Sequence, residues 1–391
     1  MSKPLLYIGL MSGTSADGID LALVDFAEQQ PKLIAKFYQA YDETTHHEIT
    51  SLYTACSNEI ERAFGLDSKL AHLFASAIKQ FLKQVNLSPD DIIAIGNHGQ
   101  TIRHRPQIAN YQQDNQSTPN AFTLQIGCNQ TLATLTNIRV VGHFRHKDMI
   151  LGGQGAPLVP AFHQALFTEH DQISGDTFVV NIGGIANLTF LPANDHDKVV
   201  TGFDTGPGNA LLDDWYQQHH SESRYDKNGD WGAQGQIHHE LLMHLLSDEY
   251  FQLAAPKSTG REVFHLDWLN DKLSNYAIAP INVQATLTAL TAQSICHEIC
   301  KLSTSGKVFL CGGGVMNSFL KQLIAQKLTS ETHQNSRFTL FTTNDVGVDS
   351  DALEAMAFAW FAYAFDHKIV GNIPAVTGAT KAAVLGNNYL P

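Results

Sequence analysis

The feature that most constrains this chain is a polar turn between two apolar strands near its start. Residues 5–8 are apolar and predict a strand, and the alternation over 19–26 predicts a second strand. The stretch Gly9–Asp20 between and around them contains small residues, hydroxyl side chains and acids. Glycine lets backbone N–H groups approach an anion closely, because no Cβ intervenes. We therefore interpret the stretch as a phosphate-binding hairpin, with an ordinary turn as the open alternative.

Side chains in this turn add to that interpretation. Ser12, Thr14 and Ser15 supply hydroxyl donors. Asp17 and Asp20 could hold Mg²⁺ through water, since this ion prefers oxygen ligands and keeps several waters. The turn is not a Walker A loop, because no Gly-Lys-Ser/Thr follows it.

Length, charge and cysteine content set limits on the rest. A chain of 391 residues predicts two domains. A net charge of −13 without a cluster of Lys and Arg argues against nucleic acid as a partner. Five scattered cysteines do not resemble a disulfide framework, and no apolar run approaches the roughly 18 residues of a membrane span. We expect a cytoplasmic protein with no membrane partner.

Polar residues follow a predicted buried strand in the first half. Residues 44–86 predict a helix, and 92–96 predict a strand that delivers Asn97–Thr101 at its C-terminal end. Open α/β sheets place ligands at such strand ends. We favour ligand contact for His98, Gln100 and Thr101, with a hydrogen-bonded structural histidine as the alternative at position 98.

A fixed loop divides the chain in this interpretation. Residues 111–120 are polar and predict an exposed loop, and 139–144 predict a strand that leads to Arg145. The stretch 152–160 contains three glycines and two prolines and is interpreted as the domain boundary region. The first domain is predicted to span 1–140 with a tail of about 370–391, and the second 141–369.

The second half repeats the opening in outline. Residues 177–182 predict a buried strand, which runs into a glycine-rich turn and a returning strand over 188–191. Asp204 follows a predicted strand over 199–203 and precedes a helix, so a helix cap is its alternative role. Residues 257–262 carry two cations and two hydroxyls, which suit a phosphate or carboxylate as well as a solvated turn.

Two further candidates lie nearer the C-terminus. The strand 307–310 runs into Gly312–Asn317, where three successive glycines would let a flat ring or a phosphate lie against bare backbone. Glu354 lies in the first turn of a predicted helix over 352–365, and a favourable interaction with the helix dipole is the alternative to a ligand role for this acid.

Together these motifs resemble the actin, Hsp70 and sugar-kinase superfamily and, more narrowly, the anhydro-N-acetylmuramic acid kinases of bacterial cell-wall recycling. The resemblance spans the chain. It implies an α/β, two-domain, actin-like ATPase (ribonuclease-H-like) fold with ATP in the cleft between the domains. The stretches that carry it are 9–20, 98–101, 152–160, 181–189, 202–209, 257–262, 312–317 and 354–359.

The resemblance also implies an activity. Members of this family use ATP and Mg²⁺ to hydrolyse the internal bridge of 1,6-anhydro-N-acetylmuramic acid and to phosphorylate O6, which gives N-acetylmuramic acid 6-phosphate and ADP. Water must attack the anomeric carbon, so a carboxylate should take its proton. Phosphoryl transfer itself needs mainly positioning and charge neutralisation. A homodimer is implied as well.

Site residues are carried over position by position. Asp204 matches the general base and Glu354 the second acid near the sugar. The predicted sugar contacts are His98, Gln100, Thr101, Arg145, Asp204 and Glu354. The predicted nucleotide contacts are Ser12, Gly13, Thr14, Ser15, Ala16, Asp17, Gly18, Ile19, Asp20, Gly183, Gly184, Ile185, Gly312, Gly313, Gly314 and Asn317, with Asp17 and Asp20 holding Mg²⁺ through water.

One departure and two rival functions stay open. His143 stands where family members usually carry Asp, which leaves the role of that position undecided. A sugar kinase acting on a free hexosamine hydroxyl would need only one base and no hydrolysis. A non-catalytic nucleotide-binding sensor would keep the glycine turns but would need neither Asp204 nor Glu354.

Overall fold

The computed structural model describes residues 3–28, 30–106, 121–167, 175–193, 198–220, 222–255, 257–261, 263–329 and 337–391. The predicted loop over 111–120 and Glu262 lie outside these residues. Contacts divide the chain into two units, one formed by 1–170 with 352–391 and the other by 171–351. The first unit is larger than the predicted first domain, since it also includes 141–170 and 352–369.

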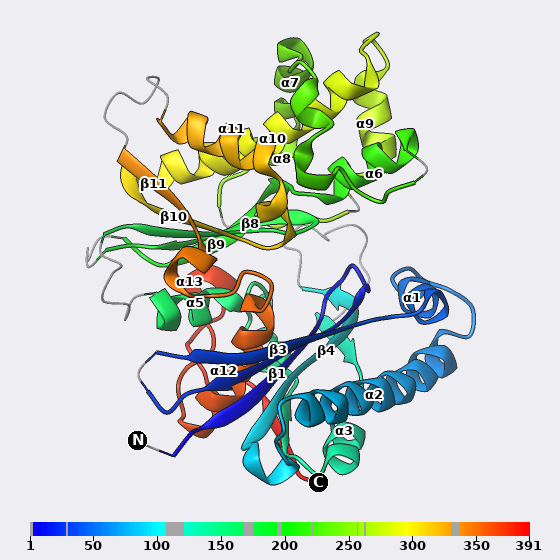
Figure 1. Cartoon of the computed structure of the whole chain (residues 1–391), viewed down its shortest axis with the longest axis vertical. Helices are drawn as coiled ribbons and strands as arrows, with labels where there is room; N and C mark the ends of the chain where they lie inside the picture. The colour runs from blue at the N-terminus through cyan, green and yellow to red at the C-terminus, as the bar shows by residue number, and fades with distance from the viewer. Residues whose placement is uncertain are drawn as a thin grey trace, which may run out of the picture. The chain divides into compact units, whose positions relative to one another are not determined.

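The first unit is built on a seven-stranded sheet in the order β12-β6-β4-β1-β2-β3, with β5 paired to β4 (Figure 1). Strands β1, β4 and β6 run parallel, while β1, β2 and β3 form an antiparallel meander. The strands are β1 (Leu6–Ser12), β2 (Gly18–Asp25), β3 (Lys32–Ala40), β4 (Ala94–Arg105), β5 (Phe122–Ile126), β6 (Val140–Gly142) and β12 (Asn387–Tyr389).

Helices cover the sheet of the first unit. They are α1 (Glu43–Thr50), α2 (Glu59–Gln84), α3 (Asn129–Thr136), α4 (Phe144–Ile150), α5 (Val159–Phe167), α12 (Leu353–Asp366) and α13 (Pro374–Thr377). The stretch 44–86 is largely helical as predicted, but it forms two helices, because the chain turns between α1 and α2.

Side chains of β1 alternate between the two faces of the sheet, as a strand requires. Leu6, Ile8 and Leu10 join the core that includes α2. On the other face, the Tyr7 ring lies edge-on to that of Tyr363 in α12, at 5.8 Å between centroids. The helix is therefore part of the first unit.

Two glycines let α12 lie directly on the strands. A Cβ added to Gly9 would lie 1.7 Å from the Ala355 carbonyl oxygen, and one added to Gly96 would lie 1.8 Å from the Phe358 carbonyl oxygen. No side chain fits in either place. Gly9 thus serves the packing of the helix that carries Glu354.

The second unit repeats this plan with five strands in the order β11-β10-β7-β8-β9. Strands β7, β10 and β11 run parallel, and β7, β8 and β9 form an antiparallel meander. In each unit, three parallel strands and an antiparallel meander of three strands share one strand, which is β1 in the first unit and β7 in the second. This shared arrangement confirms the predicted ribonuclease-H-like architecture in both units. The strands are β7 (Thr177–Ile182), β8 (Ile185–Leu191), β9 (Thr201–Pro207), β10 (Ser305–Cys311) and β11 (Arg337–Thr342).

One long helix, α10 (Pro280–Leu302), is central to the core of the second unit. Its buried residues include Leu287, Leu290 and Ile295, which join the core formed by Phe178, Val180 and their neighbours. The other helices are α6 (Ala210–His219), α7 (His239–Leu246), α8 (Glu249–Gln252), α9 (Leu266–Leu273) and α11 (Ser318–Thr329).

Two strands are longer than predicted. Strand β4 continues through Asn97–Thr101, and β9 continues to Pro207 and contains Asp204. The polar residues of both stretches are therefore held by strand pairing within a sheet, and not by loops beyond its edge.

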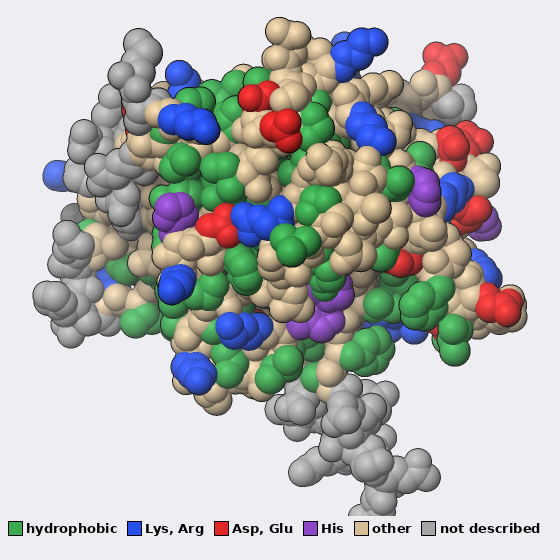
Figure 2. Space-filling view, turned by 90° about the horizontal axis from the view of Figure 1, so that it is seen from below, with side chains coloured by type: hydrophobic (Ala, Val, Ile, Leu, Met, Phe, Trp, Pro, Cys, Tyr) green, Lys and Arg blue, Asp and Glu red, His purple; other side chains and the backbone are tan. Residues whose placement is uncertain are grey.

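The surface carries charges of both signs. On the face in Figure 2, acidic, basic and hydrophobic side chains are interspersed. None of the helices in the described ranges has the length and apolar character needed to cross a membrane.

Candidate active site

The turn of the β1–β2 hairpin is fixed by side chains behind it. The Ser12 hydroxyl is buried, donates to Gln100 Oε1 at 2.5 Å and lies 2.8 Å from the Tyr41 hydroxyl. Gln100 Nε2 in turn donates to the Gly13 carbonyl at 3.0 Å. Ser12 and Gln100 therefore hold the turn in shape, a positioning role that sequence reasoning did not separate from ligand contact.

Other carbonyls of the turn are also bound by the protein. The Tyr53 hydroxyl donates to the Thr14 carbonyl at 2.8 Å, and the Tyr41 N–H donates to the Asp17 carbonyl at 2.9 Å. The side chains of Thr14, Ser15 and Asp17 are exposed. The turn thus faces inward through its carbonyl oxygens and presents hydroxyl and carboxylate side chains outward.

The geometry around Gly13 allows a direct test of this turn. A Cβ there would meet only Ser15 Oγ, at 3.7 Å, so the fold has room for a side chain. Gly13→Val should keep the fold and weaken ATP binding by about 10-fold or more, because the isopropyl group would occupy the space that the predicted hairpin role assigns to a phosphate oxygen. Calorimetric titration measures the affinity. Gly65→Val, in α2, is the control, and unchanged affinity of Gly13→Val would contradict the phosphate-binding role.

His98 and Arg145 form a buried pair in the first unit. His98 Nε2 accepts hydrogen bonds from Arg145 Nε at 3.2 Å and from Nη2 at 3.0 Å. His98 Nδ1 lies 2.8 Å from the Gly99 carbonyl, which fixes the tautomer with the proton on Nδ1. Burial, and next the charge of Arg145, lower the pKa of His98 to about 3. His98 is thus a neutral acceptor that orients the guanidinium.

The low pKa of His98 predicts a pH effect on stability. Unfolded, this histidine takes a proton near pH 6.5, whereas folded it stays neutral down to about pH 3. Its stabilising contribution is present above pH 6.5 and is lost as the pH falls, by about 1.4 kcal/mol per pH unit. His98→Gln keeps an acceptor for Arg145 but cannot titrate. Denaturant unfolding between pH 4 and 7 measures the free energy of unfolding of both proteins. Its slope against pH should be smaller in His98→Gln than in wild type by the equivalent of one proton. An equal slope in the two proteins would contradict a His98 that is neutral in the folded state.

A second group of contacts holds Arg145 from the other side. Arg145 Nη1 donates to the Gly155 carbonyl at 2.7 Å, and the Gly155 N–H donates to Asp148 Oδ2 at 2.8 Å. The buried Asp148 also accepts from Asn372 Nδ2 at 2.6 Å and from the Thr377 hydroxyl at 2.7 Å. The loop over 152–160 is thereby tied to the C-terminal segment, so the prediction that it marks the domain boundary is wrong.

Glu354 lies near this arginine. It is partly exposed in the first turn of α12. Burial lowers the pKa of Arg145 to about 10, and the charge of Glu354 opposes this lowering. Thr101, the third predicted residue of β4, accepts at its hydroxyl from Gln125 Nε2 at 3.1 Å. The structure therefore brings His98, Arg145 and Glu354 together, and it engages Gln100 and Thr101 in contacts within the sheet.

The predicted magnesium residues lie on the hairpin. Burial raises the pKa of Tyr38, and the charges of the Asp17 and Asp20 carboxylates raise it further, so these three groups are neighbours. Among the described residues, no group of three or more His, Cys, Asp or Glu is arranged to hold a metal. Two carboxylates suit an ion that takes most of its ligands from water and phosphate.

His143, at the N-terminal end of α4, has a left-handed backbone, and its ring packs against that of His146 with 4.7 Å between the ring centroids.

The glycine-rich turn of the second unit, Gly183–Ile185, connects β7 to β8. Its carbonyls face the start of α6: the Gly183 carbonyl accepts from the Asn209 N–H at 2.8 Å, and the Gly184 carbonyl from the Gly208 N–H at 3.0 Å. A Cβ on Gly183 would meet nothing closer than 3.6 Å. Like the opening hairpin, this turn uses its carbonyls internally and leaves open space beside a glycine.

The three glycines after β10 have different surroundings. Gly312 has a φ of +80°, and a Cβ there would lie 2.2 Å from Asn181 Oδ1. Gly314 packs on Ile182, where a Cβ would lie 2.3 Å from Cγ2. Only Gly313 has open space, with its nearest atom at 3.7 Å. Asn317 caps α11, since Oδ1 accepts from the Leu320 N–H at 2.9 Å.

Asp204 is oriented by neutral donors. Its Oδ2 accepts from the Ser258 hydroxyl at 2.8 Å and from the Thr259 N–H at 3.0 Å. Its carbonyl accepts from the Tyr250 hydroxyl at 2.6 Å, and its N–H donates to the Lys257 carbonyl at 3.0 Å. Asp204 does not cap α6, because it lies within β9 and Asn209 occupies the cap position.

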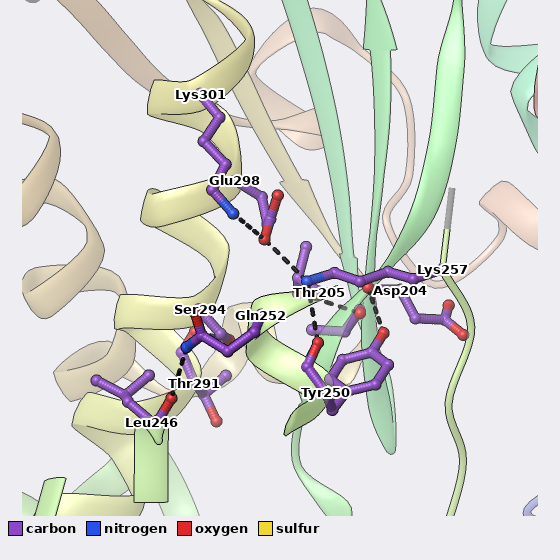
Figure 3. Close-up of polar contacts among 11 residues, drawn as sticks. Asp204, Thr205, Leu246, Tyr250, Gln252, Lys257, Thr291, Ser294, Glu298 and Lys301 are labelled. Atoms are coloured by element: carbon purple, nitrogen blue, oxygen red, sulfur yellow. Dashed lines mark hydrogen bonds and ion pairs between the residues drawn. The ribbon is translucent and has the colours of Figure 1, made fainter. Parts of the chain in front are cut away.

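Lys257 does not take the role that the sequence suggested. Its ammonium is buried and pairs with Glu298 at 2.9 Å, and Glu298 also pairs with Lys301 at 3.1 Å. The ammonium further lies 5.0 Å from the centre of the Tyr250 ring. The interpretation of Lys257 as a ligand for phosphate or carboxylate is therefore wrong. The Asp204 carboxylate points away from this ion pair (Figure 3).

Known proteins match the chain along its length. The family model of anhydro-N-acetylmuramic acid kinase matches residues 5–391. An anhydro-N-acetylmuramic acid kinase of Colwellia psychrerythraea is 56% identical over 98% of this chain and 97% of its own. One of Shewanella denitrificans is 45% identical over 100% and 99%.

Solved structures are more distant. Component A of (R)-2-hydroxyglutaryl-CoA dehydratase from Acidaminococcus fermentans is 10% identical with a TM-score of 0.46, over 93% of this chain and 100% of that chain. The ROK hexokinase of Thermus thermophilus is 12% identical with a TM-score of 0.37, over 92% and 100%. The strand order of each unit describes the fold more directly than these similarities.

Proposed function

Because the chain belongs to the anhydro-N-acetylmuramic acid kinase family, we propose that it uses ATP to convert 1,6-anhydro-N-acetylmuramic acid into N-acetylmuramic acid 6-phosphate and ADP. The family match over residues 5–391 carries this proposal, since it spans both units. The reaction would serve the recycling of peptidoglycan, in the cytoplasm and by a homodimer.

The hydrolytic half of the reaction is assigned to Asp204. Water attacks the anomeric carbon and passes a proton to this carboxylate, which the hydrogen bonds of Ser258 and Thr259 hold in one orientation. Breaking the bridge leaves O6 free to attack the γ-phosphoryl group. In the first unit, Glu354 and the Arg145 guanidinium, which His98 orients, are assigned to the sugar.

Phosphate binding is assigned to the two glycine-containing turns. In the first unit the groups are the exposed hydroxyls of Thr14 and Ser15 and the backbone N–H groups of Ser12–Asp20, while the buried Ser12 hydroxyl holds the turn in shape. In the second they are Gly183, Gly184 and Ile185, with the Gly312–Asn317 turn toward the nucleoside. The open space at Gly13, Gly183 and Gly313 supports this assignment, as does the inward direction of the carbonyls in both turns. Asp17 and Asp20 would hold Mg²⁺ through water, and the ion would neutralise phosphate charge.

A substrate panel tests the proposal. Release of ADP is measured with 1,6-anhydro-N-acetylmuramic acid, with N-acetylmuramic acid and with N-acetylglucosamine. We expect turnover with the anhydro sugar and at most weak turnover with the free hexosamines. Preferred turnover of a free hexosamine would instead favour a sugar kinase without hydrolysis. Nucleotide binding without turnover of any sugar would favour the sensor.

A further inference from the structure

The second unit contains a pocket of about 310 Å³ whose walls come from four segments of the chain. They are α6 with its cap residue Asn209, the segment that contributes Tyr225, Asp226 and Asn228, α10, and the turn over 313–317. Gly229 allows the second segment to approach the fourth, because it has a φ of +74° and a Cβ there would lie 2.1 Å from Asn317 Oδ1. The volume lies at the lower end of the range for small-molecule sites and suits a nucleoside.

Charge indicates which part of a nucleotide fits. The described lining includes two acids, Asp213 and Asp226, and contains no Lys or Arg. Asp226 is committed to the backbone, since its oxygens accept from the N–H groups of Trp231 and Gly232, each at 2.9 Å. Such a lining disfavours phosphate and favours the neutral base and ribose.

Gln284 is the unusual residue of this lining. Its side chain is fully buried on α10, and within the described part of the protein neither Nε2 nor Oε1 has a hydrogen-bond partner. A buried amide that forms no hydrogen bond is costly and rare, so it calls for an explanation. Because Gln284 is also one of the residues that line the pocket, a ligand bound there would supply the partners that its amide lacks.

Two exposed apolar side chains lie on the same lining. Tyr225 is 54% exposed and Met316 is 68% exposed. An aromatic ring and a thioether are suited to packing against a flat base. The pocket thus combines apolar contact surface for a ring with a buried amide beneath it.

We propose that Gln284 selects the base of the nucleotide, with Oε1 accepting from the exocyclic amino group of adenine and Nε2 donating to a ring nitrogen. A glutamine amide forms this bidentate pair with adenine because its donor and acceptor match the edge of the base. The inference rests on the proposed use of ATP and adds the residue that distinguishes the base.

Calorimetry with two nucleotides tests the contact. ADP is compared with the 5′-diphosphate of purine riboside, which lacks only the amino group. Wild type should bind ADP about 10-fold more tightly, because the analogue leaves Oε1 unpaired. Gln284→Leu should bind ADP about 10- to 100-fold more weakly than wild type and should bind both nucleotides equally. Gln293→Leu, on the same helix but outside the lining, should behave as wild type.

Thermal unfolding of the free protein separates this role from a structural one. Gln284→Leu should be at least as stable as wild type, because leucine has no polar group to leave unpaired. Should it fail to fold, Gln284→Met carries the same binding predictions. Wild-type affinity for ADP in either variant, or an undiminished preference for the amino group, would overturn the inference and leave the proposed function intact. A wild-type protein that binds no adenine nucleotide would overturn both.

Discussion

Asp204→Asn should lower kcat by about 10²–10⁴, the usual effect of losing a general base. Asparagine is nearly isosteric and can place its amide oxygen where Oδ2 accepts from Ser258 and Thr259. It cannot take a proton from the attacking water. Sugar and ATP binding should therefore stay close to wild type while turnover is lost.

The measurement combines steady-state kinetics with direct titration of the anhydro sugar. Asp267→Asn, on the exposed surface of α9, makes the same chemical change away from the site and should leave kcat unchanged. Turnover of Asp204→Asn within a few-fold of wild type would make Asp204 a structural residue. Glu354 would then be the next candidate for the base.

Gly9→Ala should destabilise the protein by about 3 kcal/mol or more, beyond the usual cost of overpacking. Its Cβ would lie 1.7 Å from the Ala355 carbonyl oxygen and 2.6 Å from the Ala359 nitrogen, and backbone atoms cannot turn aside as a side chain can. The helix α12 must move off β1, and Glu354 moves with it.

Gly65→Ala is the matched control for this change. Gly65 lies within α2, and a Cβ there would meet no atom within 4 Å. Alanine should stabilise the protein by about 1 kcal/mol, because it is the better helix former. Urea unfolding of both variants measures the difference. Equal stability of Gly9→Ala and wild type would contradict the direct packing of α12 on the sheet.

Short-range patterns in the sequence predicted the local structure well. The strand over 177–182 has the predicted bounds, because a few apolar residues between turn signals specify a strand. The glycine-containing turns also lie where the pattern placed them, between β1 and β2 and between β7 and β8. Each of these features depends on neighbours in the sequence.

Contacts between distant residues could not be predicted in this way. The glycines and prolines of 152–160 suggested a linker, yet Asp148 ties that loop to Asn372 and Thr377. Lys257 looked like a surface cation, yet its partner Glu298 lies on α10. The apolar helix α12 gave no sign that it packs against β1, because Gly9 suggested a phosphate turn. In each case, a partner far along the chain decides the role.

The reaction in H₂¹⁸O tests the proposed hydrolysis of the internal bridge directly. The protein is incubated with ATP and 1,6-anhydro-N-acetylmuramic acid, and the isolated sugar phosphate is analysed by mass spectrometry and NMR. We expect one ¹⁸O on the anomeric carbon and the phosphate on O6, because water opens the bridge before O6 attacks ATP. A control with unlabelled product in the same water corrects for exchange at the anomeric carbon. Phosphorylated sugar without ¹⁸O above that control would contradict hydrolysis by activated water.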